Sequence, residues 1–439
     1  MLQKTNIDVL NAIDPVNAGT GAAVLLYDRI NPAFQEYKKS RWQIYSSFLK
    51  TAPGSIEESL AVNEMVDAGL VRSSYMTLHT SRHNRSAWAE RFTQLSKSLY
   101  GEPDPIYATQ LLKREQQFVE SLLASPLISK RHAIFLIDSY RQIAAVGTVN
   151  YGEQLLPIMS DHTAHAIRHY GMFIQRRYRP VFDLVDLSNK TVFSAHDLFN
   201  IFDSALRWMQ QHDDDDWRAW RVVSTDKVSI YVSDAKKQIC IGARREPATA
   251  EEARGLLAHE LLVHALRSKN GYKTGNRLLA TGPPGYLSAE EGLGVLNEMA
   301  VNNFLPDKAR DRYLDIALAL GTIDGIKRSR KQIYKISYAR NLIRAQSKGL
   351  KPEAIKQIKP KTWAHVDRIY RGGLGFGRDS QAIFTKDIVY FVGLLEMADY
   401  IAHRIYKGEL PETVFTHISS AKFDPNNPKH LDMLRSVSV

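Results

Sequence analysis

Two histidines and two adjacent glutamates have the types and spacing of a hydrolytic metal site. Residues 259–264 read His-Glu-Leu-Leu-Val-His, and Glu-Glu-Gly-Leu follows at 290–293. Two imidazoles and one carboxylate can bind Zn2+, and a carboxylate beside them can activate water. We therefore expect zinc as the cofactor. His259 and His264 would supply nitrogens, Glu291 or Glu290 an oxygen, and Glu260 would be the general base.

The five-residue step between the two histidines constrains the helix that carries them. In a regular α-helix, such a step rotates a side chain by about 140°, so both rings could not face one ion. We therefore predict a π-bulge between His259 and His264. The alternative is that the histidines and glutamates lie on an amphipathic core helix by chance, because the bare pattern is weak.

The surrounding sequence favours the metal site over the alternative. Thr249 and Glu252 form a capping box, which predicts a helix from about Thr249 to Lys269 that ends at Asn270-Gly271. A second helix is predicted over residues 290–303. The other elements expected here are a helix at 190–211 and strands at 220–223, 229–232 and 238–242. This order predicts a predominantly helical α+β fold with a zincin-like core, in which a small sheet precedes the metal helix and the glutamate helix.

Length and composition indicate a soluble globular chain. Its 439 residues are 44% hydrophobic and 24% charged, and no apolar run reaches the roughly 20 residues that a membrane span requires. The single cysteine, Cys240, and the lack of a secretory signal predict a cytoplasmic protein. We expect an N-terminal extension at 1–59 and a catalytic domain at 60–439. That domain would comprise a helical part at 60–211, the sheet and metal helices at 212–305, and a basic helical part at 306–439.

The net charge of +11 is concentrated in one segment. Residues 326–371 hold fourteen lysines and arginines but only two acidic residues, Glu353 and Asp367. Such a segment would attract an acidic partner, such as a carboxylate-rich peptide. It could equally be a solvated basic helix face. Nucleic acid is an unlikely partner, because aromatic and basic residues do not alternate here.

The sequence around these motifs resembles a known metallopeptidase family. HELLVHALRSKNG followed by EEGL resembles the family of the microtubule-associated tyrosine carboxypeptidases, which also includes bacterial QEGLA-motif proteins described as modulating flavohaemoglobin expression. Further agreement lies in LYGEPD at 99–104, RIYRGG at 368–373 and FTKDIVYFVG at 384–393. The resemblance spans about residues 60–435. It implies zinc binding by His259, His264 and Glu291, with Glu260 as the base, whereas Gly294 stands where the motif usually has alanine.

The helix at 259–264 is also similar to the HELLGH motif of dipeptidyl peptidase III. The second motif of that enzyme has an EExRAE character, and its chain is much larger. EEGLGV at 290–295 therefore fits the carboxypeptidase family better.

A carboxypeptidase also needs a cation for the terminal carboxylate and a donor for the oxyanion. We expect Arg371 and Lys386 to bind substrate and Tyr390 to act in catalysis. Lys386 and Tyr390 are four residues apart and would share one face of a helix. A surface lysine with a packed tyrosine is the alternative.

Together these features predict a zinc-dependent metallocarboxypeptidase. Its partner would be a peptide or protein C-terminal tail, acidic in character, from which it releases tyrosine or another aromatic residue. The preference for tyrosine is implied by the resemblance alone. The alternatives are a dipeptidyl-peptidase-like or other zinc peptidase, and a non-enzymatic regulator on a zincin fold. The sequence leaves the oligomeric state open.

Overall fold

The structure, a computed structural model, describes residues 82–146, 158–213, 215–370 and 382–437. The predicted extension at 1–59 lies outside these residues. Contacts divide the chain into two compact units. One combines Met1–Leu156 with Lys308–Ile388, and the other combines Pro157–Asp307 with Val389–Val439.

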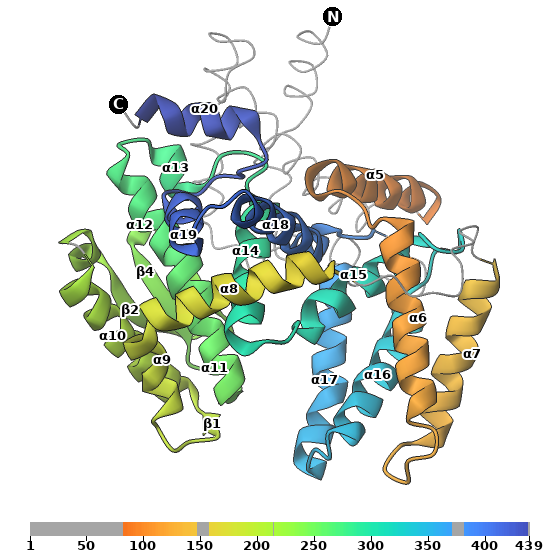
Figure 1. Cartoon of the computed structure of the whole chain (residues 1–439). Coiled ribbons are helices and arrows are strands. Elements are labelled where there is room, and N and C mark those ends of the chain that lie inside the picture. Colours follow the sequence, from red (N-terminus) through yellow and green to blue (C-terminus); the bar gives the residue numbers. More distant parts are fainter. Residues whose placement is uncertain (1–81, 147–157, 214, 371–381, 438–439) are drawn as a thin grey trace, which may run out of the picture. The chain divides into compact units, whose positions relative to one another are not determined.

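The predicted fold class is confirmed, because the described residues are mostly helical and contain only small sheets (Figure 1). None of the described helices combines the length and the apolar character needed to cross a membrane. The first unit contains helices α5 (Arg82–Tyr100), α6 (Pro105–Ser121), α7 (Lys130–Val146), α15 (Asp307–Leu320), α16 (Arg330–Ser347) and α17 (Pro352–Ile369), and the 3-10 helix η5 (Lys386–Ile388).

A buried carboxylate on α15 links the helices of the first unit. Asp315 accepts hydrogen bonds from Arg340 Nη2 at 2.6 Å and Ser337 Oγ at 2.7 Å on α16, and from His365 Nε2 at 2.8 Å on α17. Burial alone would raise the pKa of Asp315, but Arg340 and His365 hold it well below its ordinary value. These three hydrogen bonds join α15 to α16 and α17 through one buried oxygen of Asp315.

The second unit contains all the residues of the predicted metal site. Its elements are α8 (Asp161–Arg177), α9 (Arg179–Asp186), β1 (Val192–Phe193), α10 (Ala195–His212), η1 (Asp215–Ala219), β2 (Arg221–Thr225), β3 (Ile230–Ser233), η2 (Asp234–Lys236), β4 (Gln238–Gly242), β5 (Ala248–Thr249), α11 (Ala250–Leu256), the π-helix η3 (Leu257–Ala265), α12 (Leu266–Lys273), α13 (Arg277–Thr281), α14 (Leu287–Asn302), α18 (Val389–Tyr406), α19 (Pro411–Ser419) and α20 (Pro428–Val437).

The three predicted strands form one sheet in the order β2-β4-β3. Strand β4 is parallel to β2 and antiparallel to β3, and its residues Ile239, Cys240 and Ile241 are buried. Strands β3 and β4 and helix α10 all contact η3. The sheet therefore forms part of the support for the π-helix.

Two glycines allow α14 and α18 to pack so closely that their backbones are in contact. A Cβ added at Gly292 would lie 2.0 Å from the carbonyl carbon of Gly393, and a Cβ at Gly393 would lie 1.8 Å from the oxygen of Ser288. Both distances are far below van der Waals contact, so any larger residue would separate the helices. The glycine of the EEGL motif is thus explained by packing, and so is the glycine that ends FTKDIVYFVG.

We predict that Gly393→Ala destabilises the protein. The added methyl group must push α14 and α18 apart, which should lower the free energy of unfolding by roughly 1–3 kcal/mol or more. Denaturant unfolding followed by circular dichroism measures this loss. Gly255→Ala in α11 is the matched control, because its Cβ would approach only side-chain atoms, at 3.3 Å or more. Equal stability of the two variants would contradict the packing argument.

Candidate metal centre

The helix that carries the histidines starts as the sequence predicts. Thr249 Oγ1 accepts from the Glu252 amide at 3.2 Å, and the Glu252 side chain accepts from the Thr249 amide at 2.9 Å. The α-helix changes to a π-helix over Leu257–Ala265. The predicted local π geometry is therefore confirmed, and it extends over more than a single bulged turn.

The predicted end of this helix is wrong by four residues. It continues as α12 to Lys273, because Gly271 serves packing and does not terminate the helix. A Cβ at Gly271 would lie 2.1 Å from the Leu279 oxygen, and the neighbouring Asn270 side chain donates to the Ser419 carbonyl at 2.8 Å.

The π-helix brings both histidines to one point. His259 Nε2 and His264 Nε2 lie 3.0 Å apart, and Glu291 Oε2 on α14 lies 3.6 Å from the first and 3.7 Å from the second. Hydrogen bonds in a π-helix join residues five apart, so a five-residue step returns to the same face. Within the described ranges, these three residues are the one group of three or more side chains placed to hold a metal ion.

A carboxylate fixes the outer nitrogen of each imidazole. His259 Nδ1 lies 2.5 Å from Glu298 Oε1, and His264 Nδ1 lies 2.8 Å from Glu290 Oε1. A proton on Nδ1 leaves the Nε2 lone pair free, which is the arrangement found around ligating histidines. We did not anticipate Glu298 from the sequence, although it stands seven residues after Glu291, two turns along the same helix.

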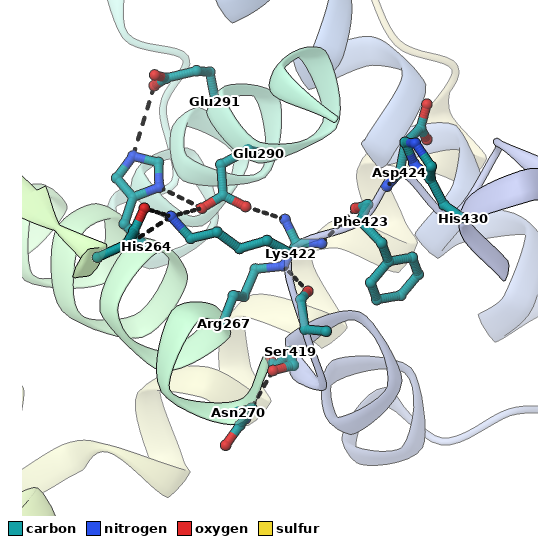
Figure 2. A network of polar contacts seen from close by, with 12 residues as sticks. His264, Arg267, Asn270, Glu290, Glu291, Ser419, Lys422, Phe423, Asp424 and His430 are labelled. Atoms are coloured by element: carbon teal, nitrogen blue, oxygen red, sulfur yellow. Dashed lines mark hydrogen bonds and ion pairs between the residues drawn. The ribbon is translucent and has the colours of Figure 1, made fainter. Parts of the chain in front are cut away.

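The structure separates the roles of the two adjacent glutamates. Glu291 faces the two Nε2 atoms, whereas Glu290 lies behind His264 and is only 2% exposed (Figure 2). The other oxygen of Glu290 accepts a hydrogen bond from Arg267, and Lys422 Nζ lies 3.2 Å from Glu290 Oε1. Glu290 therefore contacts a histidine and two cations from the outside of the site.

The segment after α19 is joined to this cluster. Arg267 Nε donates to the Ala421 carbonyl at 2.9 Å, and its Nη2 donates to the Phe423 carbonyl at 2.6 Å (Figure 2). Lys422 Nζ lies 2.9 Å from an oxygen of Asp234. No local pattern could have predicted these contacts, because Arg267 and Ala421 are 154 positions apart.

Burial and mutual pairing set the protonation of the cluster. Burial would raise the pKa of Glu290, but Lys422 and Arg267 hold it well below its usual range. Burial would lower the pKa of His264, but its hydrogen bonds to Glu290 and Glu291 raise it to about 9. The carboxylates therefore favour positive charge at the imidazoles, and the same field would favour a divalent cation between the Nε2 atoms.

Glu260 is buried next to His259, and its Oε2 atom has no hydrogen-bond partner in the part of the chain that the structure describes. Burial raises the pKa of Glu260, although the two histidines oppose this shift. A carboxylate with a raised pKa and a free oxygen is suited to proton transfer.

Gly294 makes room for the first imidazole. A Cβ at this position would lie 2.5 Å from His259 Nε2. The His259 ring therefore occupies the space that a methyl group at this position would need.

The residues predicted to bind or act on the substrate are Arg371, Lys386 and Tyr390. Arg371 lies outside the described residues. Lys386 lies in η5 of the first unit and Tyr390 in α18 of the second. The 3-10 helix η5 runs directly into α18. Their roles stay predictions.

The basic segment is divided between two kinds of residue. Its eight lysines are exposed, whereas each of its five described arginines forms an ion pair with an acidic residue: Arg328 with Asp324, Arg330 with Asp367, Arg340 with Asp315, Arg344 with Glu115 and Arg368 with Asp387. The arginines therefore stabilise the fold, and any attraction of an acidic partner would come from the lysines.

The comparison with known families agrees with this site. Residues 181–319 match the family model described as microtubule-associated tyrosine carboxypeptidase. The match confirms the resemblance, and it includes both motifs, at 259–264 and 290–293. It does not extend to 99–104, 368–373 or 384–393. No curated protein and no solved structure matches the chain.

We predict that Lys422→Met lowers stability strongly, because it removes a buried cation from Glu290 and Asp234. Breaking a buried ion pair by removing one partner costs roughly 3–5 kcal/mol. Denaturant unfolding of the two variants Lys422→Met and Lys429→Met tests this, since Lys429 is exposed. A similar small effect of both substitutions would show that the Glu290 cluster does not depend on Lys422.

Proposed function

We propose that this chain is a zinc-dependent carboxypeptidase. Its family match supports a carboxypeptidase-type function. The observation that carries the proposal is the convergence of His259 Nε2, His264 Nε2 and Glu291 Oε2, which all lie within 4.8 Å of one another. The outer nitrogen of each histidine is already paired with a carboxylate. This pairing supports a ligand role for both Nε2 atoms.

The three atoms fit a zinc ion. Two ligand atoms that each lie about 2.0–2.1 Å from a tetrahedral ion are separated by roughly 3.3 Å. The separations of 3.0, 3.6 and 3.7 Å fall on both sides of this value. Two imidazoles and a carboxylate also form one of the ligand sets of catalytic zinc, which keeps a fourth position for water or substrate.

Zinc at these atoms would supply a Lewis acid and lower the pKa of water. The residues of the chain perform the remaining work. Glu260 would accept a proton from the attacking water and deliver it to the amine of the leaving residue, and its raised pKa suits both steps. Glu298 and Glu290 would hold the imidazole rings in orientation while the charge at the site changes.

The proposed substrate is the C-terminus of a peptide or protein. Tyrosine as the released residue is supported only by the description of the matched family. An acidic tail is supported by the exposed lysines of residues 326–371. Both are further parts of this proposal.

The decisive comparison is between the wild type and Glu260→Gln. We expect both to retain about one zinc per chain, and the variant to lose cleavage of a C-terminal peptide library by roughly 10²–10⁴-fold, as general-base removal does. Elemental analysis and mass spectrometry of the digests measure the two effects. Wild-type protein without zinc, or equal cleavage by the two proteins, would sink the proposal. Bound zinc without cleavage by either protein would instead favour a regulatory role.

Glu298→Gln should weaken zinc binding, because a neutral amide is a poorer acceptor for the His259 Nδ1 proton. Loss of such a partner typically lowers metal affinity by roughly 10–100-fold. Competition with a chromophoric chelator measures the affinity, and Glu251→Gln provides a control at an exposed position nearby. If Glu298→Gln bound zinc as tightly as the control did, Glu298 would have no role in orienting the ligand.

A further inference from the structure

Arg245 is a half-buried cation whose side chain has no partner among the described residues. It follows β4 and precedes α11, and its backbone amide donates to the Gly242 carbonyl at 3.1 Å. Its Nε atom is buried without a hydrogen bond. By contrast, the neighbouring Arg244 is exposed and donates through Nε to the Asp226 carbonyl.

An unpaired guanidinium in a partly buried position is costly. Burial lowers the pKa of Arg245, which shows the penalty on its charge, but an arginine stays protonated in proteins. Arginines in such positions normally form a bidentate pair with a carboxylate or a phosphate. Arg245 therefore lacks the anionic partner that its environment calls for.

Two of the charged neighbours of Arg245 belong to the metal site. Four carboxylates raise the pKa of Arg245 through electrostatic attraction: Glu252, Glu260, Glu298 and Glu246. Glu252 is engaged in the helix cap and Glu298 binds His259. Arg245 lies in the connection between β4 and α11, which both contact the π-helix η3, and it is not paired with any of these carboxylates.

Two other cations beside this site, Arg267 and Lys422, are already engaged within the part of the chain that the structure describes. Arg267 donates to two carbonyl groups and to Glu290, and Lys422 is paired with Asp234 and Glu290. A substrate carboxylate that approaches Glu260 and Glu298 meets repulsion unless a cation is available. Arg245 can meet this need.

We propose that Arg245 binds the C-terminal carboxylate of the substrate and so limits the enzyme to the last residue of a chain. This inference rests on the proposed carboxypeptidase function. It replaces neither Arg371 nor Lys386, but it identifies a cation within the unit that carries the metal site. The competing structural role is that Arg245 only offsets the negative charge of the glutamates. In that case its loss would change zinc affinity or stability, but not the discrimination between a free and a blocked C-terminus.

The test compares two peptides that end in tyrosine, one with a free carboxylate and one with a C-terminal amide. Full-length Glu260→Gln protein loaded with zinc binds each peptide without turnover, and fluorescence anisotropy measures the dissociation constants. Adding Arg245→Met should weaken binding of the free acid by roughly 10–100-fold, as loss of charged hydrogen bonds does, and leave the amide unchanged. Arg244→Met in the same background is the matched control and should affect neither peptide.

Two further measurements keep the outcomes distinct. Zinc content and thermal unfolding are recorded for every variant, and Arg245→Lys should recover part of the preference for the free acid if Arg245→Met proves unstable. An unchanged ratio of the two dissociation constants in either Arg245 variant overturns the inference, as does equal cleavage of both peptides by the wild type. The absence of zinc or of all cleavage in the wild type overturns the proposed function itself.

Discussion

Two histidines five residues apart can face one point only if the helix between them is not a regular α-helix, and this requirement organises the second unit. The π-helix at Leu257–Ala265 satisfies it and brings the two Nε2 atoms to 3.0 Å. Strands β3 and β4 and helix α10 pack against this segment, and α14 supplies Glu291 from across the site. A helix of unusual hydrogen bonding is thus held by the packing of its neighbours, because the π form is rarely stable alone.

Charge balance around Glu290 is the second constraint. A buried carboxylate is tolerated only when cations and donors surround it, and here Arg267, Lys422 and His264 do so. Lys422 itself belongs to the segment after α19, and Arg267 donates to the carbonyls of Ala421 and Phe423 in the same segment. The last part of the chain therefore belongs to the support of the candidate metal centre. The orientation of His264 depends on residues far away in the sequence.

Unlike the paired groups around Glu290, the side chains of Glu260 and Arg245 each have a polar atom that is unpaired among the described residues and could interact with a substrate or a reacting group. Each has a buried polar atom without a partner in the described residues, whereas the groups behind the histidines are paired. Unpaired buried groups lower stability, so they are expected where a substrate or a reacting atom completes the pairing.

The sequence by itself determined the features that depend on neighbouring residues. The capping box at Thr249, the three strands, the π geometry between His259 and His264 and the predominantly helical α+β class all follow from local spacing and propensity. Only the tertiary structure decided which of Glu290 and Glu291 faces the imidazoles. It alone revealed Arg245 as an unpaired cation and Lys422 as the partner of Glu290. These facts depend on contacts between residues far apart in the chain, and hydrophobic periodicity and motif spacing carry no record of such contacts.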